Sequence, residues 1–494
     1  MFVNSTPESA GIPSGKVLKF IKALEEKGFA VHNILLSRGE KLFCECYYAP
    51  FHKDYLHRMY SVTKSFVALA IGFLEEEGKL KLDDKLVDFF PEYDTKDKGR
   101  LGELTLRDML RMSTSRDRGL NWFDEVRKME KPDRTATYFM MDHSRIPGTV
   151  FEYDSDGSYM LGVVAEKLCG KPFMEYLKDK FMREIGCSEE AHCLVAPGGY
   201  SWGDSALMCK PMDLMRTCRF VANKGVWNGK RLMNEKFLSE ATSVQSAQNL
   251  YGFKNYNTYG YGYQIWKTKN DGFFFNGMGG QYCVYDPVTD IVFEINEDTQ
   301  GNDMALNLVF SDFYNFIVDN ATEPLEENPK DYKELCDYIV SRKLYSLNGN
   351  ADSTTREKID GVTYVSENNT LMKWFRLDFK GEDRATLTYF NDRGEMSIDF
   401  GFGHNEFGLF PEEGYSDEIG ALRCPGNKYK CASSGEWCEE AKLKIRVQIV
   451  DKYFANLGMI FSFKDDEVYV MTEKRAEDFM MQYNTRFIAK AKKQ

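Results

Sequence analysis

The chain has 494 residues, of which 43% are hydrophobic and 14% are aromatic. This length exceeds the size at which a single core stops growing, so we expect two domains, and the composition excludes a disordered protein. The formal net charge of −12, without a lysine-rich tract, argues against nucleic acid or an anionic membrane as a partner.

Neither membrane insertion nor secretion is expected. No stretch approaches the ~20 apolar residues that a membrane-spanning helix needs, and residues 1–16 lack the pattern of a signal peptide. The twelve cysteines are scattered, and near His404 three of them recur every seven residues, namely Cys424, Cys431 and Cys438. That set is incomplete for zinc, so we expect free thiols in a reducing cytoplasm rather than a disulfide framework or a metal site.

The chain opens with a predicted helix and a predicted hairpin. Apolar side chains recur at helical spacing between residues 9 and 28. Two strand-like runs, 32–37 and 41–48, follow, and Arg38-Gly39-Glu40 between them is a hairpin signal.

The next predicted helix opens with a serine that precedes a lysine by three residues, Ser61 and Lys64. Residues three apart on a helix share a face, so the Lys64 amine can reach the Ser61 hydroxyl. The apolar segment that follows would partly bury Lys64, which disfavours the ammonium form and lets the amine accept the serine proton. The alternative is a solvated lysine behind a serine that only caps the helix, and the spacing does not decide between the two.

Several further elements are predicted before residue 300. Residues 113–150 are polar and rich in loop signals, and such a stretch can carry specificity. Helices are expected between 155 and 168 and over 211–223. From 259 to 296 the pattern changes to short strands.

The character of the sequence changes beyond about residue 322, so residues 1–322 are expected to form the first domain. Residues 323–345 are charged and contain proline, which indicates a linker and a helix. Residues 346–494 show short alternating runs with turn signals, which predict a mostly β accessory domain that ends in a helix near 473–483.

A second motif, Tyr153-Asp154-Ser155, leads into the 155–168 helix. Together with Ser61 and Lys64, it resembles the serine β-lactamase and penicillin-binding-protein superfamily. Within it, the likeness is to the branch of class C β-lactamases, esterases and 6-aminohexanoate-dimer hydrolases. The resemblance implies that Tyr153 shuttles a proton between Ser61, Lys64 and the leaving group; the alternative is a packed aromatic at a helix entry. Ser155 stands where the family usually has asparagine, and its hydroxyl can still bind Lys64 or a substrate carbonyl with a shorter reach.

The third motif of this resemblance is the glycine-rich segment 273–281, which contains Gly277-Met278-Gly279-Gly280-Gln281. The resemblance implies that Gly277 keeps the backbone close to the substrate and that the Met278 N–H forms the oxyanion hole with the Ser61 N–H. Phe275 occupies the position of the family's lysine, so an anchor for a substrate carboxylate is missing and neutral esters or amides fit better. The alternative is a plain glycine-rich hairpin.

A competing motif is Gly199-Tyr200-Ser201-Trp202-Gly203, which fits the G-x-S-x-G nucleophile elbow. An elbow needs a strand directly before it and a helix directly after it. Pro197-Gly198 interrupts the first, and the helix begins only at Pro211. We therefore expect Trp202 either to wall the substrate cleft or to pack in the core.

The resemblance covers about residues 5–320, and it implies an α/β (α+β) β-lactamase-like catalytic domain. It has a central antiparallel sheet flanked by helices and a helical subdomain, and a mostly β C-terminal domain follows. The implied function is a cytoplasmic serine hydrolase that cleaves a small ester or amide substrate through an acyl-enzyme on Ser61, with no metal or cofactor. Lys64 and Tyr153 move the proton, and Ser155, Trp202, Gly277 and Phe275 contact the substrate.

Two alternatives remain. A β-lactamase or D-amino-acid peptidase of the same superfamily needs a cation for the substrate carboxylate, for which the sequence offers Arg116, Arg118 or Lys267. The second alternative is a non-catalytic binding or sensor protein on the same scaffold. The three motifs are largely intact, which argues against it.

Overall fold

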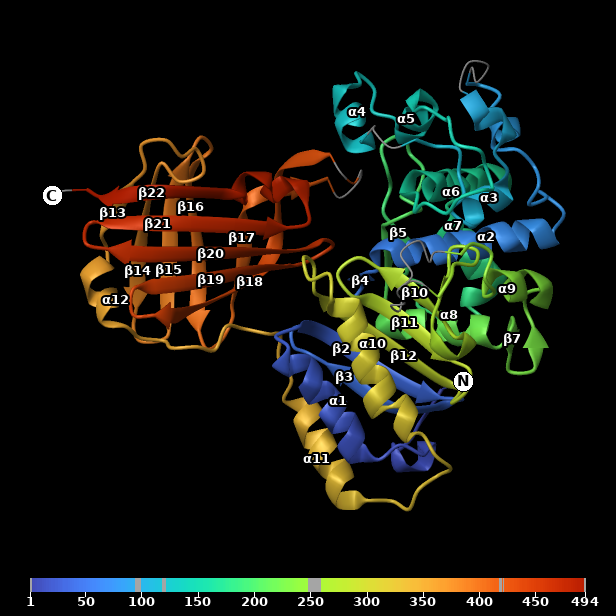
Figure 1. The fold of residues 1–494 in the computed structure, drawn as a ribbon, viewed down its shortest axis with the longest axis horizontal. Coiled ribbons are helices and arrows are strands. Elements are labelled where there is room, and N and C mark those ends of the chain that lie inside the picture. Colours follow the sequence, from blue (N-terminus) through green and yellow to red (C-terminus); the bar gives the residue numbers. More distant parts are fainter. Residues whose placement is uncertain are drawn as a thin grey trace. The chain divides into compact units, whose positions relative to one another are not determined.

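The computed structural model describes residues 2–93, 99–117, 121–247, 259–416, 420 and 422–492. The chain divides into two compact units (Figure 1). The first consists of Met1–Glu297, Asp303–Lys343 and Asp417–Leu422, and the second of Asp298–Asn302, Leu344–Ser416 and Arg423–Gln494. Each unit has its own sheet, as the change in sequence character predicts.

The first unit is built on a seven-stranded sheet with the order β1-β3-β2-β12-β11-β10-β9. The strands are β1 (Val3–Asn4), β2 (Ala30–Arg38), β3 (Lys41–Tyr47), β9 (Trp266–Lys267), β10 (Phe273–Gly277), β11 (Gln281–Asp286) and β12 (Ile291–Asp298). The pairs β2–β3, β9–β10, β10–β11 and β11–β12 are antiparallel, and the short β1 runs parallel to β3. The sheet therefore joins the predicted hairpin near the start of the chain to the predicted strands at 259–296.

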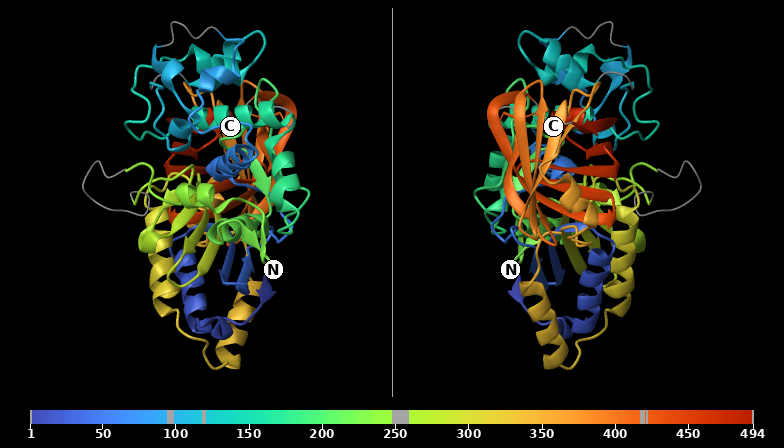
Figure 2. Two further views of the ribbon diagram at one scale, coloured as in Figure 1. Left: turned by 90° about the vertical axis from the view of Figure 1, so that its right-hand side faces the viewer. Right: turned by 90° about the vertical axis from the view of Figure 1, so that its left-hand side faces the viewer.

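Three helices cover one face of this sheet: α1 (Ser14–Glu26), α10 (Ala305–Phe316) and α11 (Pro329–Val340). In Figure 2 the dark blue α1 stands between the yellow α10 and the golden α11, and α1 contacts both. Strand residues alternate between faces, so Phe293 of β12 points into this layer, where its ring lies 5.4 Å from Phe20 and 4.8 Å from Phe313. Glu294, the next residue, is directed to the other face.

The central helix α2 (Thr63–Glu76) is buried on every side from Thr63 to Leu74. It contacts α6 (Ser155–Cys169) and α7 (Phe173–Leu177), while α8 (Pro211–Ala222) packs on β11. A helix that is apolar all round belongs in the interior. The predicted nucleophile motif thus stands at the end of the most deeply buried helix of this unit.

Short elements make up the rest of the first unit. The helical ones are η1 (Glu8–Ala10), η2 (Tyr60–Val62), η3 (Leu86–Phe89), η4 (Gly99–Glu103), α3 (Leu106–Leu110), α4 (Trp122–Lys128), α5 (Arg134–Met140), η5 (Lys178–Met182), α9 (Glu235–Ala241), η6 (Lys269–Asp271) and η7 (Val318–Asn320). The strands are β4 (His57–Arg58), β5 (His192–Cys193), β6 (Leu207–Cys209), β7 (Val226–Trp227) and β8 (Lys230–Arg231). The stretch predicted to be rich in loops contains α4 and α5, because Asn121 and Asp133 cap their first turns.

The second unit is a ten-stranded sheet with the order β16-β15-β14-β13-β22-β21-β20-β19-β18-β17, which confirms the expected mostly β domain. Its strands are β13 (Thr363–Val365), β14 (Trp374–Lys380), β15 (Arg384–Asn391), β16 (Gly394–Phe402), β17 (Glu406–Tyr415), β18 (Arg423–Glu439), β19 (Lys442–Val450), β20 (Phe454–Lys464), β21 (Glu467–Arg475) and β22 (Thr485–Ala491). A parallel pairing of β16 with β18 closes the sheet on itself. The helix α12 (Thr354–Ile359) precedes β13.

The helix predicted near 473–483 is confirmed in part, as the short 3-10 helix η8 (Asp478–Tyr483). The strand β21 continues to Arg475, so the helix begins later than expected. The last element of the domain is not this helix but β22, which lies between β13 and β21 in the sheet. Phe479, Met480 and Tyr483 of η8 are buried, and their spacing is the helical signal in the sequence. None of the helices in the described ranges is long and apolar enough to span a membrane.

Candidate active site

Ser61 lies in η2, immediately before α2, and it is half-buried between buried neighbours. Tyr60 before it has a φ of +46°, a left-handed conformation that is uncommon for a residue with a side chain and that often marks functional turns. Thr63 holds the turn, because its hydroxyl donates to the Tyr60 carbonyl at 2.5 Å and accepts from the Leu207 N–H at 2.9 Å. The turn that presents Ser61 is therefore tied to β6.

Lys64 is the second residue of α2 and is only 1% exposed. Its Nζ donates to the Ser61 Oγ at 3.0 Å and to the backbone carbonyl of Asp204 at 2.7 Å. The same Nζ lies 4.9 Å from the ring centroid of Tyr153. The structure thus brings together Ser61, Lys64 and Tyr153, which stand in two separate sequence motifs.

Tyr153 lies two residues before the start of α6 and is 39% exposed. Its ring stacks on Trp266 of β9 with centroids 5.8 Å apart. Asp154 is the N-cap of α6, where its carboxylate accepts the backbone N–H groups of Asp156 and Gly157. Ser155 is the first residue of α6 and is half-buried. Because Asp154 provides the cap, the Ser155 hydroxyl is not needed for it.

The glycine-rich turn between β10 and β11 packs against the segment that leads to Ser61. A Cβ on Gly277 would lie 2.2 Å from the Met59 carbonyl oxygen, so only glycine fits there. Gln281 fixes the turn by donating to the Met278 carbonyl at 3.1 Å and to the Glu297 carbonyl at 2.8 Å. Met278 at the tip is 47% exposed. The structure therefore places the predicted oxyanion segment next to the nucleophile turn.

Two predicted substrate contacts lie in the interior. Phe275 is fully buried in β10 opposite Cys283. Trp202 is buried as well, and it packs edge-on against Trp122 at 5.4 Å and under the Arg58 guanidinium at 5.0 Å. For Trp202, this burial fits the core-packing interpretation better than the cleft wall.

The competing serine, Ser201, is buried in an irregular loop and not on a strand-to-helix turn. Its backbone N–H donates to Glu166 at 3.2 Å, and it forms an isolated bridge with Val195. Neither strand nor helix flanks it directly, so this segment lacks the context of a nucleophile elbow.

Sequence reasoning missed Asp204, Arg134 and Asp156 as parts of the site. The carbonyl of Asp204 binds Lys64, and its carboxylate pairs with Arg134, which also pairs with Asp156. Arg134 lies in the stretch predicted to be rich in loops, where nothing pointed to it.

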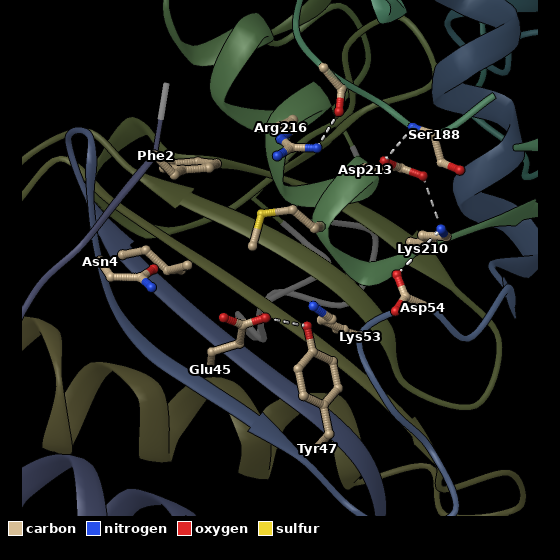
Figure 3. A pocket seen from close by; sticks show the side chains of 13 residues that line it. Phe2, Asn4, Glu45, Tyr47, Lys53, Asp54, Ser188, Lys210, Asp213 and Arg216 are labelled. Carbon is tan, nitrogen blue, oxygen red and sulfur yellow. Dashed lines mark hydrogen bonds and ion pairs between the residues drawn. The ribbon is translucent and has the colours of Figure 1, made fainter. Parts of the chain in front are cut away.

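A separate polar cavity of about 450 Å³ lies between β3 and the start of α8 (Figure 3). Within it, Tyr47 donates to Glu45 at 2.8 Å, and Lys210 pairs with Asp54 at 3.4 Å. Its lining residues include none of the three predicted catalytic side chains. This cavity is therefore distinct from the site around Ser61.

A family model described as Beta-lactamase matches residues 20–305, which is more than half of the chain. The chain belongs to the beta-lactamase family. This family member is 26% identical over 282 residues to the 6-aminohexanoate-dimer hydrolase of Paenarthrobacter ureafaciens, a match that covers 52% of this chain and 70% of that protein.

Two solved structures share the fold of this beta-lactamase family member. A candidate 6-aminohexanoate-dimer hydrolase from Bacillus anthracis has a TM-score of 0.51 and 19% identity, and it covers 62% of this chain and 83% of its own. A candidate beta-lactamase from Bacteroides dorei DSM 17855 has a TM-score of 0.50 and 18% identity, and it covers 61% of this chain and 98% of its own. The comparisons confirm the expected family and its fold, and the protein is a serine hydrolase of the β-lactamase and penicillin-binding-protein superfamily.

Proposed function

We propose that the protein cleaves an ester or amide bond of a small substrate through an acyl-enzyme on Ser61. The observation that carries this proposal is the 3.0 Å contact between the Ser61 Oγ and the buried Nζ of Lys64. A serine is a weak nucleophile until a neighbouring base takes its proton. Lys64 is placed to act as that base.

The reaction takes place in two halves. The Ser61 Oγ bonds to the substrate carbonyl carbon while its proton passes to Lys64, and the N–H groups of Ser61 and Met278 bind the oxyanion. Tyr153 delivers the proton to the leaving alcohol or amine as the bond to that group breaks. Water then attacks the acyl carbon and gives its proton to Tyr153 or Lys64. That proton passes on to the Ser61 Oγ as its bond to the acyl carbon breaks and the acid leaves.

Neutral substrates are favoured because the nearby cations already have partners. Arg116 pairs with Asp154 at 3.3 Å and with Asp156 at 2.9 Å. Lys267 is buried and pairs with Asp271 at 2.8 Å. A β-lactamase or D-amino-acid peptidase that used Arg116 would have to break its pairs with the buried Asp154 and Asp156, at the cost of an uncompensated buried charge. Arg118, the third cation that the sequence offered, lies outside the described residues.

The relative from Paenarthrobacter ureafaciens is named for hydrolysis of the 6-aminohexanoate dimer, which supports small amides among the substrates. We assign the reaction to residues 1–322, with 323–345 as a linker and helix and 346–494 as an accessory domain. All twelve cysteines are free, which supports a reducing cytoplasm as the location.

Intact-mass measurement tests the nucleophile. A fluorophosphonate should add one adduct to the parent protein and none to Ser61→Ala, while a penicillin should add little to either. Ser201→Ala is the matched control and should be labelled like the parent. An adduct that persists in Ser61→Ala, or none in the parent, contradicts the mechanism.

Steady-state kinetics test the substrate class. A short p-nitrophenyl ester should be turned over by the parent protein, whereas nitrocefin should be hydrolysed poorly for want of a free cation. Hydrolysis of nitrocefin at a rate equal to or above that of the ester would favour the β-lactamase alternative instead.

A further inference from the structure

The residue that holds Lys64 belongs to a buried ion pair. Lys64 donates to the backbone carbonyl of Asp204 at 2.7 Å. The side-chain carboxylate of the same Asp204 accepts from Arg134 at 2.6 Å, and Arg134 also donates to Asp156 at 3.1 Å. The position of the carbonyl that binds Lys64 therefore depends on an arginine of α5.

Arg134 is a fixed cation. Its side chain is 1% exposed, and its guanidinium carbon lies 4.0 Å from the ring centroid of Trp122 and 4.2 Å from that of Tyr159. Burial acts to lower the pKa of Arg134, but attraction by Asp204 and Asp156 outweighs burial and raises it. The guanidinium is thus charged and clamped between two rings, and it cannot turn toward solvent without breaking both ion pairs.

The same chain of charges reaches the other proton-transfer residue. Arg116 pairs with Asp156 at 2.9 Å and with Asp154 at 3.3 Å. Asp154 directly follows Tyr153 and caps α6 through the N–H groups of Asp156 and Gly157, both at 3.1 Å. The backbone that carries Tyr153 is consequently held by Arg116 through the cap.

We infer that this arginine–aspartate chain positions Lys64 and Tyr153 relative to each other for proton transfer; it consists of Arg116, Arg134, Asp154, Asp156 and Asp204. The inference rests on the proposed function. A gain in folding free energy does not explain why these five charged residues are buried together, because desolvating buried charges costs about as much as their attraction returns. A role in positioning does explain it, since a displacement of ~1 Å at a catalytic group can lower the rate by ~10²-fold.

The first test is steady-state kinetics of the full-length protein with Arg134→Gln. We expect kcat for ester hydrolysis to fall by about 10- to 100-fold with KM nearly unchanged, because a misplaced Lys64 affects the transition state and not ground-state binding. Arg134→Lys keeps the charge and should recover part of the loss. The matched control is Arg219→Gln, which removes another buried arginine paired with an aspartate, Asp290, and should keep the parent kcat.

The second readout is the acid limb of the profile of kcat/KM against pH. Lys64 faces Ser61, Tyr153 and the Asp204 carbonyl. Removing the Arg134 cation leaves the Asp204 and Asp156 carboxylates without their partner, and their negative charge favours protonation at the site, so the limb should move to higher pH. Asp204→Asn removes a negative charge and should move it to lower pH. A merely structural role would not move the limb in opposite directions.

The outcomes separate this inference from the proposed function. If the parent protein is not labelled on Ser61, the proposed function fails and the inference fails with it. If the parent is active and labelled but Arg134→Gln keeps the parent kcat and acid limb, only the inference is overturned. Should Arg134→Gln not fold by circular dichroism, Asp204→Asn and Arg116→Gln decide by the same measurements, and parent-like kinetics in both would overturn it.

Discussion

Gly277 shows how one residue without a side chain shapes the site. It ends β10, where the strand approaches the backbone of Met59, two residues before the nucleophile. The requirement is steric and not conformational, since a Cβ at this point would overlap a carbonyl oxygen. Any larger residue must displace either the turn or Ser61.

Gly277→Ala should therefore lower kcat/KM strongly, by about 100-fold, because a shift of ~1 Å at Ser61 has an effect of that size. Ester hydrolysis measures the effect, and circular dichroism should show that the fold is kept. Gly102→Ala is the matched control, since a Cβ there meets nothing within 4 Å. Equal activity of the two variants would contradict the close-approach argument.

His57 is a second residue whose surroundings have a measurable effect. It is buried beside His32, with 2.8 Å between the ring nitrogens, and its Nδ1 contacts the Arg58 carbonyl at 2.9 Å. Burial lowers the pKa of His57 to about 3, although the hydrogen bond to the backbone of Arg58 opposes that shift. The folded protein thus holds this imidazole neutral.

Stability should consequently fall in acid. The contribution of neutral His57 is fully present above the unfolded pKa of ~6.5 and is lost as pH falls from there toward about 3. Within this window the group removes up to ~1.4 kcal/mol of unfolding free energy per pH unit. Urea unfolding at pH 7, 6 and 5 should give a shallower dependence on pH for His57→Asn than for the parent. Parallel curves would show that His57 does not titrate on unfolding.

At the scale of elements, α2 is the framework for the nucleophile. Every residue from Thr63 to Leu74 is buried, so its position is set by packing on all sides. Even its glycine is constrained, because a Cβ on Gly72 would lie 2.4 Å from Met233 and 2.5 Å from Phe237. The packing around α2 therefore fixes the position of the helix, and with it the distance between Ser61 and Lys64.

Ile71→Ala in the middle of α2 should destabilise the protein by about 2–5 kcal/mol, since it removes a fully buried side chain and leaves a cavity. Denaturant unfolding measures the change. Val340→Ala at the end of α11, where the side chain is 87% exposed, should change it by less than ~0.5 kcal/mol. If the unfolding free energy fell by a similarly small amount in both variants, the residues around Ile71 would have moved to fill the cavity.

Predictability also differed between elements. Strands that alternate between buried and more exposed residues, such as β14 and β21 of the second unit, were recognisable because a half-buried strand has a period of two. The helix expected near 473–483 begins later than predicted, because β21 continues to Arg475 and only the part with buried Phe479, Met480 and Tyr483 forms the 3-10 helix η8. The short α4 and α5 were missed because their helical content depends on caps and tertiary packing more than on an amphipathic stripe.

At the scale of the whole molecule, the thiols report on the fold in both units. All twelve cysteines are free, and Cys438 is the exposed one among them. Burial, followed by the charge of Glu436, raises the pKa of Cys438, so it reacts slowly at neutral pH. Several others, including Cys44 and Cys209, are buried with pKa values raised mainly by burial.

N-ethylmaleimide should therefore modify all twelve cysteines of the denatured protein without any reductant, and Cys438 first in the native protein. Intact mass counts the adducts, and peptide mapping locates the first one. Cys438→Ser is the control and should remove the earliest native adduct. Fewer than twelve adducts after denaturation would reveal a disulfide and argue against the reducing location.

What the sequence determined by itself was local. The reach from Ser61 to Lys64 follows from helical periodicity, and the place of Tyr153 follows from a motif that opens a helix. The tertiary structure alone decided the contacts made across long separations. The Asp204 carbonyl that binds Lys64 lies 140 residues away from it in the chain. Arg134 pairs with the side-chain carboxylate of Asp204 from 70 residues away. No periodicity encodes such contacts, because they form only when separate helices and loops pack around one buried charge.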